Sequence, residues 1–161
     1  MRKKKGLIDT LHTCQDNHLK DLLTHCRKSS RLELKGAVKR LLPAMQYDPA
    51  IKAFLRNATL DGGTLLVQIS NRQHAIYPAD IRSLVGDMQS KNIGYALFIT
   101  TTNLFSDSID LDELPTHHSI LFINGRQLAK YLNICADNIP PNHPIPPIIF
   151  QKHTLEIIFL P

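Results

Sequence analysis

The sequence predicts a single α/β domain in which helices flank a mixed central sheet. Segments with apolar residues every three or four positions alternate with short β-prone runs. Two of these runs, Tyr95–Thr100 and Ser119–Ile123, lack polar alternation, as strands covered on both faces do. The 161 residues, of which 43% are hydrophobic, suffice for one core of ordinary size and are too few for two.

Two helices are predicted at the N-terminal end. Residues 1–30 start with a basic run and continue as an amphipathic helix, because apolar residues recur there at helical spacing. Ser29 and Ser30 are N-cap residue types for a second helix from Arg31 to Leu42, which Pro43 is expected to end. This second helix opens the main domain, residues 31–137.

A β-hairpin is predicted after these helices. Two apolar runs between Ile51 and Ile69 flank Asp61-Gly62-Gly63, and Asp-Gly between strand-like residues favours a tight turn. The second strand of this hairpin, Leu65–Ile69, is expected to be buried.

The rest of the main domain is predicted to alternate helices and strands. Pro78 suits the first turn of a third helix, which Asn92-Ile93-Gly94 ends. The two buried strands described above follow, and Asn124-Gly125 then leads into a last helix.

Residues 138–161 differ in composition from the main domain. Five prolines fall between positions 140 and 147, and this density predicts an extended linker. The segment Ile148–Leu160 is apolar and β-prone, so it would promote aggregation if it were left uncovered. We expect it to be an extended strand that pairs with an edge of the sheet or with another chain.

The net charge favours an anionic partner. Lys and Arg number 19 against 14 Asp and Glu, which gives a formal charge of +5. On helices, the basic residues of the first quarter would either contact phosphates or form a solvated face. They are Arg2 to Lys5, Arg27, Lys28, Arg31, Lys35, Lys39 and Arg40.

The cysteines predict a cytoplasmic location, and the hydropathy predicts that the chain does not span a membrane. Three widely spaced cysteines without a CxxC pair are typical of reduced thiols. No apolar run is long enough to span a bilayer. His12, Cys14, His18, His25 and Cys26 are potential zinc ligands, but their spacing fits surface histidines and buried thiols better than a zinc finger. His117 and His118 are expected in a polar loop.

Several short motifs follow one another in a recognisable order. They are Leu32-Glu33-Leu34 at a helix start, Gln68-Ile69-Ser70 ending a strand, Ile81-Arg82-Ser83-Leu84-Val85-Gly86 in a helix, Ala96 to Thr101 with Phe105 after it, and Ile120 to Leu128. In this order they resemble the catalytic domain of Mrr-type restriction endonucleases, of the PD-(D/E)xK nuclease superfamily. The resemblance extends from Leu32 to about Leu132 and implies a three-layer restriction-endonuclease-like fold.

The resemblance implies a site where an acid on one hairpin strand and Gln68 on the next hold Mg²⁺. A lysine two residues after Gln68 would lie on the same strand face, but Ser70 stands there and cannot supply a fixed positive charge. The only acidic residue between Asp48 and Asp80 is Asp61, which at a hairpin tip would lie away from Gln68. Glu33 matches the acid of the family's first helix.

Three functions remain open at this stage. The first is DNA binding with impaired or absent cleavage, with Lys35, Lys39, Arg40, Arg72 and Arg82 as candidate DNA contacts. The second is an active Mg²⁺-dependent endonuclease of a prokaryotic restriction or defence system, with Asp61 and Gln68 as metal ligands, Glu33 assisting, and Arg72 or Lys91 replacing the missing lysine. The third is a non-catalytic interaction subunit that forms a homodimer or binds a protein partner through its C-terminal strand.

Overall fold

The computed structural model describes residues 19–71, 75–102, 119–136 and 147–161. Its centre is a four-stranded sheet with the strand order β3-β2-β1-β6, and all three pairings are parallel. The strands are β1 (Thr64–Ser70), β2 (Tyr95–Thr100), β3 (Ser119–Ile123) and β6 (Glu156–Phe159).

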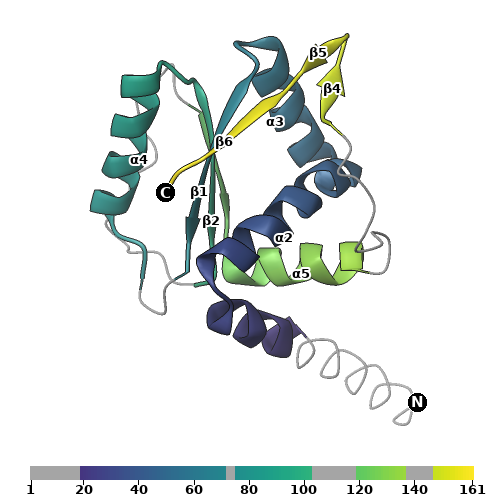
Figure 1. Cartoon of the computed structure of the whole chain (residues 1–161), viewed down its shortest axis with the longest axis vertical. Coiled ribbons are helices and arrows are strands. Elements are labelled where there is room, and N and C mark those ends of the chain that lie inside the picture. The colour runs from purple at the N-terminus through teal and green to yellow at the C-terminus, as the bar shows by residue number, and fades with distance from the viewer. Residues whose placement is uncertain (1–18, 72–74, 103–118, 137–146) are drawn as a thin grey trace, which may run out of the picture.

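Helices cover both faces of this sheet (Figure 1). One face carries α2 (Arg31–Ala44), α3 (Pro49–Leu60) and α5 (Gly125–Ala136), whereas α4 (Pro78–Lys91) is the one described helix on the other. Residues 19–28 form a further helix that precedes α2. The predicted α/β class, with a central sheet between helices, is confirmed.

Alternation along β1 divides its side chains between the two faces. Leu65, Val67 and Ile69 belong to the core under α2, α3 and α5, whereas Leu66 packs in the core under α4. Side chains two positions apart share a strand face, so Gln68 and Ser70 lie on the α4 side with Leu66. This placement decides which groups can meet them.

Strands β2 and β3 and helix α4 have the bounds that the sequence predicts. Pro78 stands in the first turn of α4, and Asp80 Oδ2 accepts a hydrogen bond of 2.9 Å from the backbone N–H of Tyr77. Asn92 ends the helix in the left-handed conformation at φ 54°. The last helix also starts as expected, because Asn124 Oδ1 and Gln127 Oε1 each accept from the other residue's backbone N–H.

The predicted hairpin is wrong, because its first strand is the helix α3. Asp48 caps this helix by accepting a hydrogen bond of 3.0 Å from Ala50 N–H, and Pro49 occupies its first turn. Its buried residues, among them Ile51 and Leu55, recur at helical spacing. Gly62 and Gly63, at φ 97° and 71°, turn the chain from α3 into β1. The sheet is therefore parallel instead of mixed.

Helix α2 also extends beyond its predicted end. Pro43 lies inside its last turn and does not terminate it. Proline removes one backbone donor, but the N–H of Met45 still bonds to Leu41 O, and the chain continues as a short 3₁₀ helix, Met45–Tyr47.

The C-terminal segment pairs with an edge of the sheet, which is the first of the two predicted alternatives. Strand β6 pairs with β1 from Thr64↔Glu156 to Val67↔Phe159. The ammonium groups of Lys35 and Lys39 lie 5.2 and 5.4 Å from the centre of the Phe159 ring. A two-stranded antiparallel pair, β4 (Ile149–Phe150) and β5 (His153–Thr154), precedes β6. Within the described residues, no helix is long and apolar enough to cross a membrane.

Candidate functional site

A groove of about 710 Å³ opens at the C-terminal end of β1, between that strand and α4. Its walls come from four parts of the chain: the start of α2, the end of β1, one face of α4 and the residues that follow β6. The lining residues are Arg31, Gln68, Ile69, Ser70, Asn71, Ser83, Asp87, Lys91, Leu160 and Pro161.

The α4 wall of this groove carries two charged groups. Ser83, Asp87 and Lys91 follow one another at intervals of four residues and so lie along one face of the helix. Asp87 is half-buried and Lys91 is exposed. The structure thus brings Lys91, one of the two predicted replacements for the missing lysine, into the same groove as Gln68 and Ser70.

Sequence reasoning missed Asp87. A usable signal was present, because Asp87 precedes Lys91 by one helical turn and both flank the buried stripe of Leu84 and Met88. The resemblance places the acid in the segment before Gln68, so it indicated Asp61 and not Asp87. The groove shows that a carboxylate also reaches this site from the helix that follows.

Ser70 is the most unusual polar residue of the groove. Its side chain is 6% exposed, and its Oγ has no hydrogen-bond partner among the described residues. A buried hydroxyl without a partner costs about 1–3 kcal/mol.

Asp61 lies at the opposite end of β1. It caps the C-terminus of α3, and its Oδ2 accepts a hydrogen bond of 3.4 Å from the hydroxyl of Tyr95, which begins β2. Burial, and then the neighbouring Asp61 carboxylate, raise the pKa of Tyr95. At a rise of about 3.3 Å per residue, Thr64 and Gln68 alone are roughly 13 Å apart. The structure does not bring the predicted ligand pair Asp61 and Gln68 together.

The donor atoms of the groove fit a hard divalent cation in kind. Gln68 offers an amide oxygen, Asp87 a carboxylate and Ser70 a hydroxyl, and Mg²⁺ is commonly bound by one or two carboxylates together with water and phosphate. Such a cation would polarise a phosphate. Among the described residues, no three His, Cys, Asp or Glu side chains come together as a metal cluster.

The helix formed by residues 19–28 is fixed to this end of the sheet by Asn71. The Asn71 amide donates to the carbonyls of Cys26, Arg27 and Ser29 at 3.4, 3.3 and 3.2 Å, and its Oδ1 accepts from Thr101 Oγ1 at 3.0 Å. The guanidinium of Arg27 donates in turn to Thr101 O. Because Asn71 follows Ser70 directly, this basic helix is held beside the groove.

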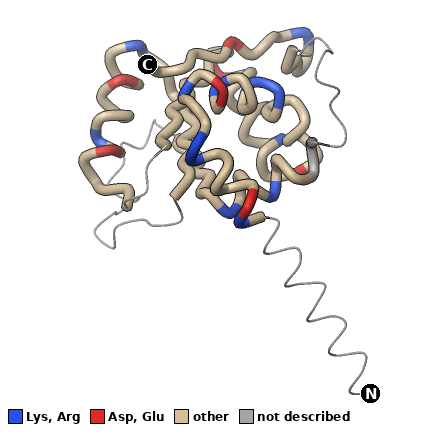
Figure 2. Tube along the Cα trace, turned by 60° about the horizontal axis from the view of Figure 1, so that its bottom comes forward, with Lys and Arg blue, Asp and Glu red and all other residues tan. Residues whose placement is uncertain are grey.

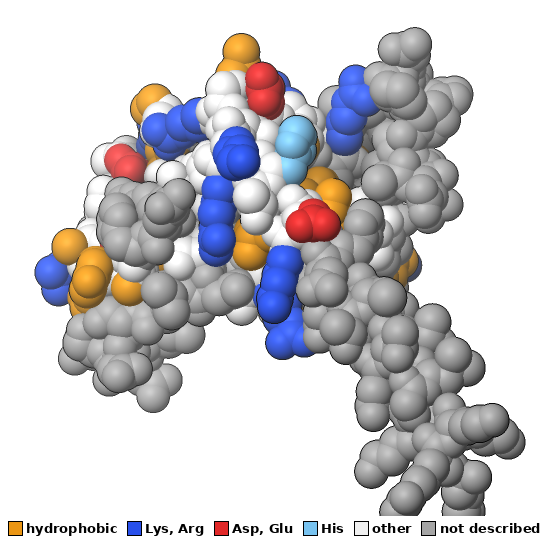
Figure 3. Space-filling model, turned by 90° about the horizontal axis from the view of Figure 1, so that it is seen from below, with side chains coloured by type: hydrophobic (Ala, Val, Ile, Leu, Met, Phe, Trp, Pro, Cys, Tyr) orange, Lys and Arg blue, Asp and Glu red, His pale blue; other side chains and the backbone are white. Residues whose placement is uncertain are grey.

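The predicted DNA contacts do not lie on one face. Lys35 and Lys39 lie over Phe159, Arg82 is exposed on α4 outside the groove lining, and Arg72 is outside the described residues. Figure 2 shows Lys and Arg distributed over several helices, and α4, at the left, carries both signs of charge. On the face seen in Figure 3, basic side chains lie among acidic and hydrophobic ones.

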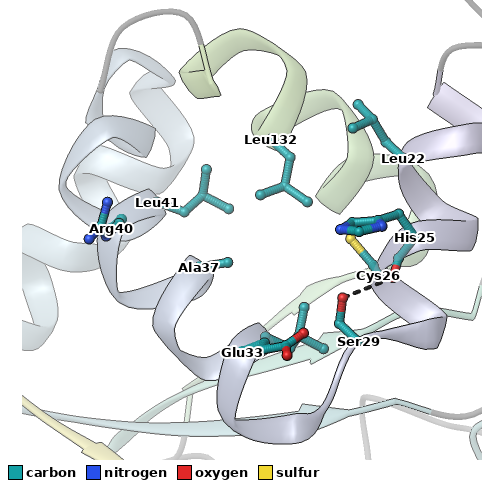
Figure 4. Close-up of a pocket in the computed structure, with 10 residues that line it drawn as sticks. Leu22, His25, Cys26, Ser29, Glu33, Ala37, Arg40, Leu41 and Leu132 are labelled. Atoms are coloured by element: carbon teal, nitrogen blue, oxygen red, sulfur yellow. Dashed lines mark hydrogen bonds between the residues drawn. The ribbon is translucent and has the colours of Figure 1, made fainter. Parts of the chain in front are cut away.

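A second cavity, of about 360 Å³, lies between residues 19–28, α2 and α5 (Figure 4). Leucines make up much of its wall, and Glu33 and Arg40 line it from α2, so Glu33 is not among the residues that line the Gln68 groove. Burial raises the pKa of the Cys26 thiol, which favours the uncharged form. Of the other candidate zinc ligands, His25 also lines this cavity, whereas His12, Cys14 and His18 lie outside the described residues, as do His117 and His118.

Comparison with known protein families gives a match over most of the main domain. Residues 26–132, well over half of the chain, match the family model of the Mrr catalytic domain, which is described as a restriction endonuclease. The match contains α2, α3, β1, α4, β2 and β3 and most of α5, and therefore Gln68, Ser70, Asp87 and Lys91. No curated protein and no solved structure matches.

Proposed function

Because this chain belongs to the Mrr-type restriction endonuclease family, we propose that it binds DNA and that its ability to cleave DNA is impaired. The arrangement at β1 carries the proposal. The lysine position holds Ser70, and Asp61, the acid nearest to Gln68 in the preceding sequence, lies at the other end of the strand. A phosphodiester in the groove would meet polar groups without the family's full catalytic set.

The basic groups around the groove support binding to a phosphate backbone. Lys91 is exposed on one wall, and Arg31 lies on the other, where its Nη2 donates to the carbonyl oxygen of Pro161. The helix of residues 19–28, held by Asn71, adds Lys28, which is exposed. Contacts from Lys and Arg to phosphates supply most sequence-independent affinity for DNA.

Fluorescence anisotropy with a labelled DNA duplex tests the binding. Because bound phosphates release counterions, affinity should fall linearly with salt on logarithmic axes. In parallel, supercoiled plasmid, methylated and unmethylated, is incubated with Mg²⁺ or Mn²⁺ at low salt. Salt-dependent binding without nicking is expected, and an affinity for DNA that is absent or insensitive to salt would contradict the proposal.

A working endonuclease is the second candidate, and the composition of the groove favours it. Asp87 and Lys91 bring a carboxylate and a cation to Gln68 and Ser70 from α4, so both missing groups have a candidate replacement. In this case Mg²⁺-dependent nicking occurs, and Asp87→Asn and Lys91→Met each abolish it. Nicking that survives both substitutions would point to a contaminating nuclease.

The interaction function is tied to the edge of the sheet. Strand β6 is the last strand of the order, and its outer edge pairs with none of the other described strands, so a second copy or a partner strand could add there. A concentration-dependent mass in analytical ultracentrifugation would support this third function. The family membership also leads us to place the protein in the cytoplasm, in a prokaryotic defence system.

A further inference from the structure

We infer that the cavity between residues 19–28, α2 and α5 binds a small molecule with an apolar body and one anionic head, such as a medium-chain carboxylate (Figure 4). This cavity shares no lining residue with the groove at the end of β1. The inference therefore goes beyond the proposed function and does not depend on DNA binding.

The size of the cavity is the first support. Protein interiors are packed about as densely as organic crystals, and the space between helices is normally filled by side chains. Here three short side chains, Cys26, Ser29 and Ala37, line the space, and about 360 Å³ stays unfilled. A cavity of about 150 Å³ holds benzene, and ligand sites start at about 300 Å³, so this space suits a molecule of roughly twice the size of benzene.

The apolar wall of the cavity is the second support. Six of the ten lining residues are apolar, namely Leu22, Cys26, Leu34, Ala37, Leu41 and Leu132. Leu22 and Leu132 are only half-buried, so part of each side chain is in contact with water. A ligand that covers these side chains is stabilised by the apolar area that it removes from water.

The distribution of charge is the third support, and it favours an anion. Figure 4 shows Glu33 next to Ser29 at one end of the cavity and Arg40 at the other end, with Ala37 between them. Glu33 and Arg40 are seven positions apart on α2, which corresponds to a rise of about 10 Å. An anionic head at Arg40 therefore stays clear of the Glu33 carboxylate.

Arg40 is the group that would bind the head. Among the described residues, its guanidinium makes no hydrogen bond or ion pair, so its donors are available to a ligand. A guanidinium binds a carboxylate through two parallel hydrogen bonds. Leu41 lies beside Arg40 in Figure 4, so the apolar body of the ligand would have a partner next to its head.

Titration of the full chain with decanoate, followed by the ¹³C methyl signals of its leucines, tests the inference directly. The signals of Leu22, Leu41 and Leu132 should shift and saturate, with a dissociation constant of about 1 mM or lower, as expected for a ligand of this size. Leu84, in the core under α4, should not shift. Absence of saturable shifts would overturn the inference, and so would shifts of equal size at Leu84.

A pair of methionine variants on α2 tests whether the cavity is the site. Ala37→Met fills the cavity and should weaken decanoate binding at least about tenfold, because the ligand must displace the added side chain. Gly36→Met adds the same side chain at an exposed position with open space around it, and it should leave the affinity unchanged. Equal affinities of these two variants, each shown to be folded by circular dichroism, would refute the site.

A pair of charge-removing variants tests the anionic head and does not depend on repacking of the cavity. Arg40→Gln should weaken decanoate binding about threefold, the scale of a solvent-exposed ion pair. Lys39→Gln removes the same charge from the neighbouring residue, which lies over Phe159, and it should have no effect. Equal affinities of the two variants would refute the role of Arg40.

Decylammonium, which has the same apolar body and the opposite charge, tests the preference for an anion. It should bind more weakly than decanoate, and equal or tighter binding would overturn that preference. A second copy of the chain is the other occupant that an apolar cavity accepts. In that case the leucine signals would change on dilution of the protein without decanoate, and this result would overturn the small-molecule assignment.

Discussion

The two ends of strand β1 differ in how their polar groups are used. At the N-terminal end, Asp61 accepts a hydrogen bond from Tyr95, and Gly62 and Gly63 complete a turn from α3. At the C-terminal end, Gln68 and Ser70 open into a groove shared with α4. The first arrangement joins two elements, whereas the second leaves donors and acceptors available to a ligand. The comparison shows that Asp61, the acid nearest before Gln68 in the sequence, is not the acid that shares a groove with Gln68.

The C-terminal end is also where the N-terminal residues 19–28 join the sheet. Asn71 fixes residues 19–28 to it, and a Cβ added at Gly125 would lie 2.4 Å from the carbonyl oxygen of Thr101. The edge of the sheet that bears the groove is therefore joined both to residues 19–28 and to the start of α5.

The largest effect is expected from Ser70→Lys, which returns a cation to the position where the family has lysine. With Mg²⁺ present, this variant should nick plasmid roughly 10²-fold faster than the wild-type protein, the scale of a lost electrostatic group at an active site. Plasmid nicking over time measures it. Ser70→Met, of similar length without the charge, is the control, and equal rates for the two variants would refute a role for the groove in cleavage.

A smaller effect, on stability, is expected from Asn71→Ala. The substitution removes the hydrogen bonds that fix residues 19–28 and leaves their carbonyls without this donor, which should cost about 1–3 kcal/mol of unfolding free energy. Urea unfolding measures the change. Asn57→Ala, at an exposed position of α3, should change stability by no more than about 0.5 kcal/mol. Equal losses of unfolding free energy in the two variants would show that the Asn71 hydrogen bonds to residues 19–28 do not stabilise the fold.

The smallest effect is expected at the other end of β1, from Asp61→Asn. Tyr95 has a raised pKa, so it stabilises the fold fully below its ordinary value near 10, and this contribution is lost as the pH rises through the raised value. Burial is the main cause and Asp61 the next, so the variant should lower the pKa of Tyr95 only in part. Absorbance titration of the tyrosines, with Tyr95→Phe to assign the signal, measures it.

The fold was largely predictable because its signals are local. The buried runs at Tyr95–Thr100 and Ser119–Ile123 and the proline at the start of α4 specify their elements without help from distant residues. The hairpin prediction failed because Asp-Gly-Gly also ends helices, and the cap at Asp48 with Pro49 was the competing signal. Parallel pairing of β6 depends on contacts between segments far apart in the sequence.

The site was predictable only in part. Gln68 and Ser70 follow from the order of the motifs, and Lys91 from its place at the end of α4. Asp87 had a weaker signal, its place one helical turn before Lys91 beside the buried stripe of Leu84 and Met88, and several other polar residues of α4 competed with it.

A matched pair of charge reversals tests most directly that the C-terminal end of β1 is the functional end. Lys91→Glu, in the groove, is compared with Lys52→Glu, on the exposed surface of α3, so that the net charge changes equally. Measured by anisotropy with duplex DNA over a range of salt, Lys91→Glu should weaken binding about tenfold and reduce the salt slope by about one, and Lys52→Glu should do little. Equal effects of the two, or a larger effect of Lys52→Glu, would contradict the account.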